Sequence, residues 1–229
     1  MEFSLLGAAL LGVAAVYGVI YWEAARGNAA DCSKDLWDVS LGAATAGLVV
    51  GRLAAMIIAG TNPLTEPGDI LIVRSGVDTG WAAVGALVAL AVISRRETVL
   101  VAGGLAAAAL AGLGAWEAGC LVRDTCHGTV TDLPWGISLG GSEITRHPVG
   151  IYTALLFFVA ALAVMWLKRR TQNPLMVGGV TLAAAGSVRL VTEPMRSALG
   201  GRPTLWYLTA VFLGVGVVVV AQYRQRVEP

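Results

Sequence analysis

Seven long runs of apolar residues follow one another along the chain, separated by polar and charged stretches. They lie at 3–22, 38–60, 80–94, 98–116, 149–167, 175–192 and 205–222. Each is long enough, or nearly so, to cross the ~30 Å hydrocarbon core of a bilayer as a helix, and the short third run is expected to begin a few residues earlier. Because lipid cannot satisfy backbone polar groups, and because the alternating segments of a membrane barrel are absent, the pattern predicts an all-α integral membrane bundle of about seven transmembrane helices.

Composition agrees with a membrane protein. Hydrophobic residues make up 56% of the 229 residues and charged residues 14%, whereas a soluble domain carries about 25% charged residues. The formal net charge is +1, and three cysteines are too few for a disulfide framework. We therefore expect residues 1–229 to form a single transmembrane domain, with no cofactor, no metal and no nucleic-acid partner.

Basic residues in the short loops predict the orientation, because cytoplasmic loops are enriched in lysine and arginine. The loops after the odd-numbered runs contain Arg26, Lys34, Arg95, Arg96, Lys168, Arg169, Arg170, Arg224 and Arg226. With seven spans these residues share one side, which predicts the N-terminus outside and the C-terminus in the cytoplasm. The loops at 61–79, 117–148 and 193–204 then face outward, so topology does not explain their arginines.

Four ionisable residues lie within or at the end of predicted spans. Arg52 lies inside the second span, where an arginine costs at least ~2.5–3.5 kcal/mol in lipid; it is expected either to lock helix packing through an ion pair or to bind a phosphate or carboxylate. Arg189, Glu193 and Arg196 have the spacing i, i+4, i+7, which predicts one shared helix face. They would form either a mutually satisfied ladder or a guanidinium pair, steered by Glu193, that grips an anionic head group.

The predicted outward loop 117–148 concentrates reactive side chains. It holds both histidines and two of the three cysteines: Cys120, Cys126, His127 and His147. Three chemistries stay open for them. Their spacing is not a standard zinc pattern, a disulfide would need an oxidising compartment, and a cysteine–histidine nucleophile pair rests only on proximity in the chain.

Four motifs occur in order along the chain. They are Gly-Arg-Leu at 51–53, the segment 118–128 with Gly119 and Gly128, the pair 131–136 and 146–152, and the segment 188–196. Together with the span count and the outward N-terminus, they resemble the bacterial prolipoprotein diacylglyceryl transferase family. The pair is the most specific, since Thr-Asp-Leu-Pro-Trp-Gly followed by Arg-His-Pro is similar to the family's own pattern.

The resemblance implies a multi-pass protein of the bacterial cytoplasmic (inner) membrane. Such a protein moves diacylglyceryl from phosphatidylglycerol, or a similar anionic phospholipid, to a cysteine thiol of a lipoprotein precursor. Arg146 and Arg189 are then the expected phosphate clamp, and His147 is either the base or a cap of the next helix. The remaining residues of the implied substrate-binding set are Arg52, Gly119, Gly128, Arg123, Glu193 and Arg196.

The chain also departs from the family pattern. Glu117 stands where the family has a functional arginine, Cys120 stands where it has an asparagine, and a family histidine near the third span has no counterpart. Arg123 is the candidate to supply the missing charge. We favour a divergent transferase, and keep as alternatives a catalytically degenerate member that binds phospholipid or a partner membrane protein, and a lipid transferase acting on another nucleophile.

Overall fold

The computed structural model describes residues 2–28, 30, 32–66, 68, 76–121, 128–138, 143–197 and 203–227, and the side chains of these residues other than 2–6 and 121. The chain divides into two compact units, Met1–Ala30 with Gly103–Pro229, and Asp31–Ala102. We describe each unit by itself.

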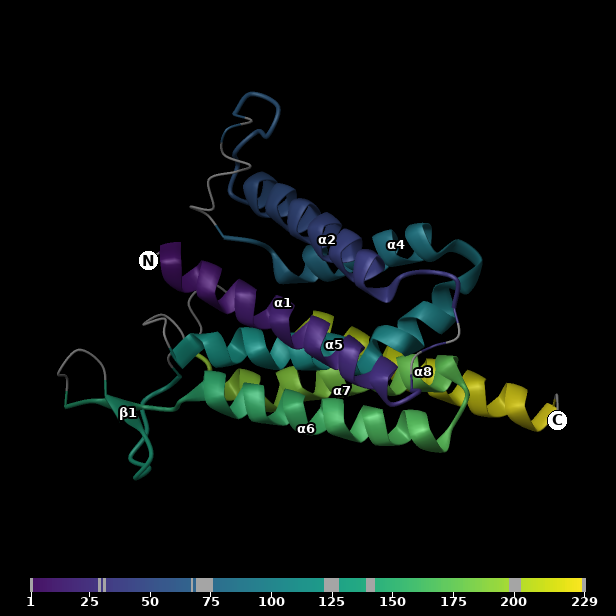
Figure 1. Cartoon of the computed structure of the whole chain (residues 1–229). Helices are drawn as coiled ribbons and strands as arrows, with labels where there is room; N and C mark the ends of the chain where they lie inside the picture. Colours follow the sequence, from purple (N-terminus) through teal and green to yellow (C-terminus); the bar gives the residue numbers. More distant parts are fainter. Residues whose placement is uncertain are drawn as a thin grey trace. The chain divides into compact units, whose positions relative to one another are not determined.

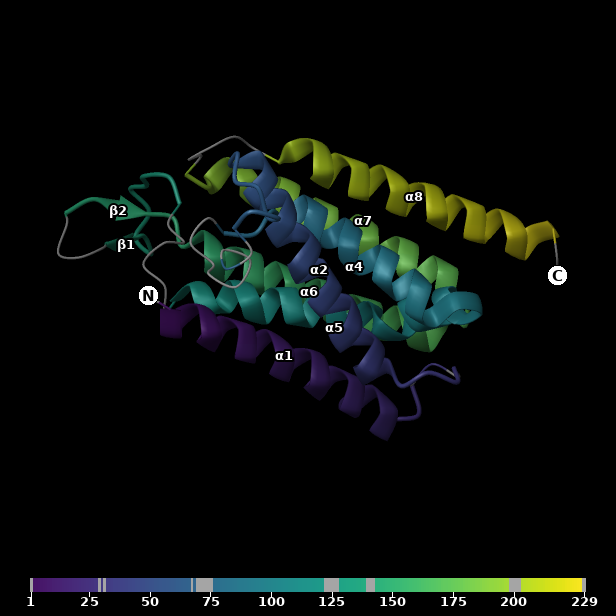
Figure 2. The same ribbon diagram turned by 90° about the horizontal axis from the view of Figure 1, so that it is seen from above.

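The larger unit is a bundle of long helices that lie side by side in both views (Figures 1 and 2). Its helices are α1 (Glu2–Ala25), most of α5 (Thr98–Ala118), α6 (Val149–Arg170), α7 (Pro174–Thr192) and α8 (Thr204–Val227). Short 3-10 turns follow α5 and α7, at η2 (Gly119–Leu121) and η3 (Glu193–Met195). A small hairpin, β1 (Ile137–Ser138) paired antiparallel with β2 (Thr145–Arg146), lies between α5 and α6 in the chain.

The core of this unit lies between α5, α6 and α7. Phe157 and Leu110 are completely buried there, with Ala107 and Val164 beside them. The side chains of α5 in this core are mostly alanine, and small side chains let helix backbones approach closely. The many alanines and glycines of the fourth apolar run therefore allow α5 to pack closely against α6 and α7.

The smaller unit contains α2 (Leu36–Ile58), α4 (Thr79–Ser94) and the turn η1 (Arg95–Glu97). Aspartate side chains begin both helices: Asp35 accepts hydrogen bonds from backbone N–H groups at the start of α2, and Asp78 does so at the start of α4. The two helices touch at glycines, since a Cβ on Gly51 would lie 2.7 Å from the carbonyl oxygen of Asp78.

Six helical segments among the described residues are long and apolar enough to cross a membrane. The third, Thr79–Ala118, has 40 residues, and as one straight helix it would measure about 60 Å, twice the hydrocarbon thickness. The helix is interrupted at Arg95, whose φ is +49°, so that α4 and α5 are separate elements. The predicted all-α membrane bundle is confirmed; the seven crossings, the outward N-terminus and the single domain stay predictions.

Candidate functional site

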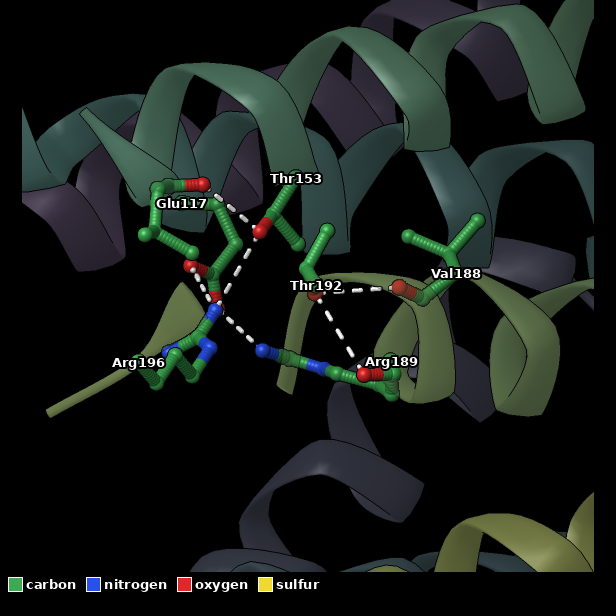
Figure 3. A network of polar contacts seen from close by, with 7 residues as sticks. Glu117, Thr153, Val188, Arg189, Thr192 and Arg196 are labelled. Atoms are coloured by element: carbon green, nitrogen blue, oxygen red, sulfur yellow. Dashed lines mark hydrogen bonds and ion pairs between the residues drawn. The ribbon is translucent and has the colours of Figure 1, made fainter. Parts of the chain in front are cut away.

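A buried carboxylate joins two arginines where α5 and α7 end (Figure 3). Arg189 Nη1 donates to Glu117 Oε1 at 2.6 Å, and Arg196 Nη2 donates to Glu117 Oε2 at 2.8 Å. The Glu117 side chain is 4% exposed, whereas those of Arg189 and Arg196 are 19% and 31% exposed. We call these three residues the arginine–glutamate cluster. Its carboxylate is the most buried member, and both guanidinium groups point toward it (Figure 3).

Local chain geometry brings the two arginines to the same carboxylate. Arg189 lies in the last turn of α7, which ends at Thr192 because Pro194 follows and lacks a backbone N–H. The chain tightens into η3 and then becomes extended at Arg196, with φ −79° and ψ 140°. The two arginines therefore reach Glu117 from a helix and from an extended segment.

Neighbouring groups hold the guanidinium of Arg196 in place on one side only. Its Nη2 also donates to the hydroxyl of Thr153 at 3.3 Å, and that hydroxyl donates to the carbonyl of Val149 at 2.7 Å. Its Nε is buried and has no hydrogen-bond partner among the described residues. Arg189 lies over the ring of Phe157, 5.4 Å from the centroid, a cation–π contact. One donor of the Arg196 guanidinium therefore has no acceptor among the described residues.

The segment around Gly128 connects the cluster to the hairpin. The backbone of Gly128 pairs with that of Arg196 in an antiparallel bridge, and its N–H donates to the carbonyl of His147 at 3.0 Å. Arg146 Nη1 donates to the carbonyl of Gly128 at 3.3 Å. Arg146 and Arg196 therefore flank one short stretch of backbone. A Cβ on Gly128 would lie 2.6 Å from the carbonyl oxygen of Met195, so the stretch fits only with glycine.

His147 lies next to this stretch with an unused ring nitrogen. Its Nδ1 is buried and finds no hydrogen-bond partner in the part of the chain that the structure describes. Its ring meets the ring of Tyr152 edge-on at 6.2 Å, and Tyr152 accepts a hydrogen bond from Trp135 at 2.7 Å. The N-cap residue of α6 is Pro148, which makes no side-chain capping hydrogen bond. The two alternatives for His147, a base or a cap of this helix, stay predictions.

The other predicted site residues lie elsewhere. Arg52 belongs to the smaller unit, where it is 4% exposed and donates to the carbonyl of Gly76 at 2.9 Å. Gly119 contacts Ala8 of α1 so closely that an added Cβ would collide with its Cβ. Arg123 lies outside the described residues. Glu193 is 8% exposed, and the carboxylate that pairs with both arginines is that of Glu117, not that of Glu193 as the ladder hypothesis expected.

Two of the open chemistries can be compared with the structure. The sulfur of Cys120 is disulfide-bonded; Cys126 and His127 lie outside the described residues. Among the residues that are described, no three His, Cys, Asp or Glu side chains are grouped so that they could hold a metal ion.

The sequence analysis did not predict one buried ion pair, between Glu23 and Lys168. Lys168 Nζ donates to Glu23 Oε2 at 2.8 Å, with side chains 9% and 4% exposed, and it also donates to the carbonyl of Gly104 at 3.1 Å. The sequence could have indicated this pair, because Glu23 and Lys168 each follow an apolar run directly and both lie on the predicted cytoplasmic side of the membrane. This pair joins the C-terminal ends of α1 and α6 to the beginning of α5, at the opposite end of these helices from Glu117.

Helices of membrane length, together with a buried carboxylate paired with two partly exposed arginines, define a multi-pass membrane protein with a charged cluster at its helix ends. Comparison with known proteins gives the family. The sequence profile of the prolipoprotein diacylglyceryl transferases matches residues 5–223, and the chain belongs to this family. This confirms the resemblance seen in the four motifs.

Two relatives illustrate the similarity. A protein of Geobacter sulfurreducens is 29% identical over 194 residues, which cover 82% of this chain and 75% of the relative. A protein of Cupriavidus pinatubonensis is 30% identical over 219 residues, which cover 88% of this chain and 78% of the relative. Both relatives are named phosphatidylglycerol–prolipoprotein diacylglyceryl transferase.

Proposed function

We propose that this protein transfers the diacylglyceryl group of phosphatidylglycerol to a cysteine thiol of a lipoprotein precursor. The thiol sulfur forms a bond to the glyceryl carbon while the bond from that carbon to the phosphate oxygen breaks. The thiol proton leaves to a base, and glycerol phosphate departs with one more negative charge than the phosphodiester had. The precursor supplies the nucleophile, so the protein must hold the phosphate and accept a proton.

The arginine–glutamate cluster is the observation that carries this proposal. Negative charge grows on the phosphate as the carbon–oxygen bond breaks, and fixed donors at that point stabilise the transition state. Arg189 and Arg196 are held by Glu117 in a defined geometry, and Arg196 keeps a buried Nε–H without a partner among the described residues. Arg146, at the neighbouring carbonyl of Gly128, is the third guanidinium that we assign to phosphate binding.

We assign proton transfer to His147. Neutral imidazole is the side chain best suited to accept a proton near neutral pH. Its Nδ1 has no partner among the described residues, and its backbone lies beside Gly128, whose carbonyl Arg146 binds. A substrate thiol next to Gly128 would therefore lie near both the arginines assigned to the phosphate and the imidazole assigned to accept its proton.

We further propose that the bundle lies in the bacterial cytoplasmic membrane with the cluster toward the outside. The C-terminal ends of α1 and α6 support this orientation. Arg26 lies 3.9 Å from the ring of Trp22, and Arg170 lies 5.1 Å from that of Trp166. Tryptophan and basic residues gather at membrane interfaces, the basic ones on the cytoplasmic side. Glu117, at the far end of α5, then faces the outer leaflet.

The direct test is transfer of labelled diacylglyceryl from phosphatidylglycerol to a lipobox peptide by the purified protein. We expect turnover that is lost in Arg189→Ala and in Arg146→Ala. Arg224→Ala is the matched control, because Arg224 is an exposed arginine in the last turn of α8, and its turnover should equal that of the unmodified protein. Absence of turnover with phosphatidylglycerol still bound would refute the transferase and favour the lipid-binding alternative.

A further inference from the structure

We propose that Glu117 weakens the binding of a doubly charged phosphomonoester to the site relative to that of a singly charged phosphodiester. This rests on the proposed function, in that the ligand is a lipid phosphate held by the arginines. It adds a residue that separates the substrate from the departing glycerol phosphate. Glu117 would then affect both the class of lipid that binds and the release of the product.

The charges around the cluster support this. Arg189 and Arg196 bring two positive charges, and Glu117 neutralises one, leaving +1 on the three residues. Two neighbours also carry charge: Glu193 in η3, and Arg146 at the carbonyl of Gly128. Their charges are opposite, so the sum over these five described groups is again +1. Without Glu117 the same sum would be +2, so Glu117 reduces the attraction of these groups for each negative charge of a ligand.

The geometry explains why Glu117 stays in the site when a ligand binds. Each of its oxygens accepts from a different arginine, and its side chain is 4% exposed. Moving a carboxylate so deeply buried away from both partners would leave an uncompensated buried charge, which is strongly unfavourable. The side chains of Arg189 and Arg196 are 19% and 31% exposed. A phosphate oxygen can therefore approach them while Glu117 keeps its own two contacts.

The consequence is electrostatic. A phosphodiester carries one charge, whereas a phosphomonoester carries about −1.5 to −2 at neutral pH. The second charge of the phosphomonoester is attracted by the arginines, and Glu117 reduces this attraction. A negative charge about 6 Å from Glu117 is repelled by it by roughly 1.4 kcal/mol at an effective dielectric constant of about 40, which is about tenfold in affinity. Glycerol phosphate, the product, is therefore held less tightly than it would be without Glu117.

The test measures lipid binding without turnover, so it needs no peptide. The full-length protein in nanodiscs is titrated with phosphatidylglycerol and with phosphatidic acid of the same acyl chains, at pH 8. We expect Glu117→Gln to shift the ratio of the two affinities about tenfold toward phosphatidic acid, chiefly through tighter binding of phosphatidic acid, whereas Glu117→Asp should keep the ratio of the unmodified protein. Glu117→Met removes the same charge and is used if Glu117→Gln does not fold.

Glu23→Gln is the matched control. Glu23 is also buried and ion-paired, at the other end of α5 and α6, so its variant loses the same charge at the same burial without touching the arginines. Its ratio of affinities should equal that of the unmodified protein; an equal shift in Glu23→Gln would overturn the proposal. An unchanged ratio in the variants that remove the charge of Glu117 also overturns it. A shift in Glu117→Gln without any peptide transfer by the unmodified protein would refute the transferase alone.

Discussion

The tightest contact of the site is at Gly128, and it predicts the effect of adding one methyl group. A Cβ there would lie 2.6 Å from the carbonyl oxygen of Met195, 2.6 Å from Val149 Cγ2 and 2.7 Å from His147 Cβ. Two of these neighbours are backbone or Cβ atoms, which cannot move alone. The stretch that holds Arg146 and the stretch that holds Arg196 must therefore separate.

Overpacking of this kind costs about 1–3 kcal/mol. For a chain of this length, 1 kcal/mol corresponds to about 2–4 °C in Tm, so Gly128→Ala should lower Tm by about 2–12 °C. Transfer activity should fall further than stability, because Arg196 moves with the displaced backbone and its contact with Glu117 is only 2.8 Å long.

The assay is thermal unfolding in detergent, followed by intrinsic tryptophan fluorescence, together with the transfer reaction. Gly178→Ala is the control. A Cβ on Gly178 meets nothing within 4 Å, and alanine is preferred over glycine inside a helix by about 1 kcal/mol, so Tm should be unchanged or higher. If Gly128→Ala unfolds at the temperature of the unmodified protein and transfers lipid equally well, the close contacts around Gly128 are not those that the structure shows.

Three further variants test other parts of the argument. Lys168→Met leaves the Glu23 carboxylate buried without its cation and should lower the free energy of unfolding by about 3–5 kcal/mol, measured by chemical denaturation; the double variant with Glu23→Gln should regain much of it. His147→Gln should lower kcat by about 10²–10⁴-fold with little change in KM for the lipid, and a large rise in KM instead would assign His147 to binding. Arg196→Lys loses the fork that reaches both Glu117 and Thr153 and should weaken phosphatidylglycerol binding about tenfold; unchanged binding would remove Arg196 from the phosphate site.

Hydropathy alone located the helices well. The predicted runs 149–167 and 175–192 correspond to α6 (Val149–Arg170) and α7 (Pro174–Thr192), because the length of an apolar run is set by the bilayer it must cross. The short third run is α4, and the structure begins it at Thr79, one residue before the predicted start. The break at Arg95 is also where two arginines interrupt the apolar pattern.

The site was predicted less completely, for a physical reason. Spacing along one helix placed Arg189, Glu193 and Arg196 on a common face, but α7 ends at Thr192, so helical periodicity does not extend to Arg196. The actual partner of both arginines, Glu117, is 72 and 79 residues away in the chain. The sequence marked Glu117 as a departure from the family pattern, yet only the packing of α5 against α6 and α7 shows that it neutralises the pair.

The ion pair between Glu23 and Lys168 also constrains how the protein is made. Glu23 is synthesised 145 residues before its partner, so α1 is made long before the cation that neutralises this carboxylate. A carboxylate buried without its cation is destabilising, and α6 supplies that cation. The first helix can therefore reach its final packing only after the fifth apolar run has been made, and a chain truncated before Lys168 would leave Glu23 without its partner.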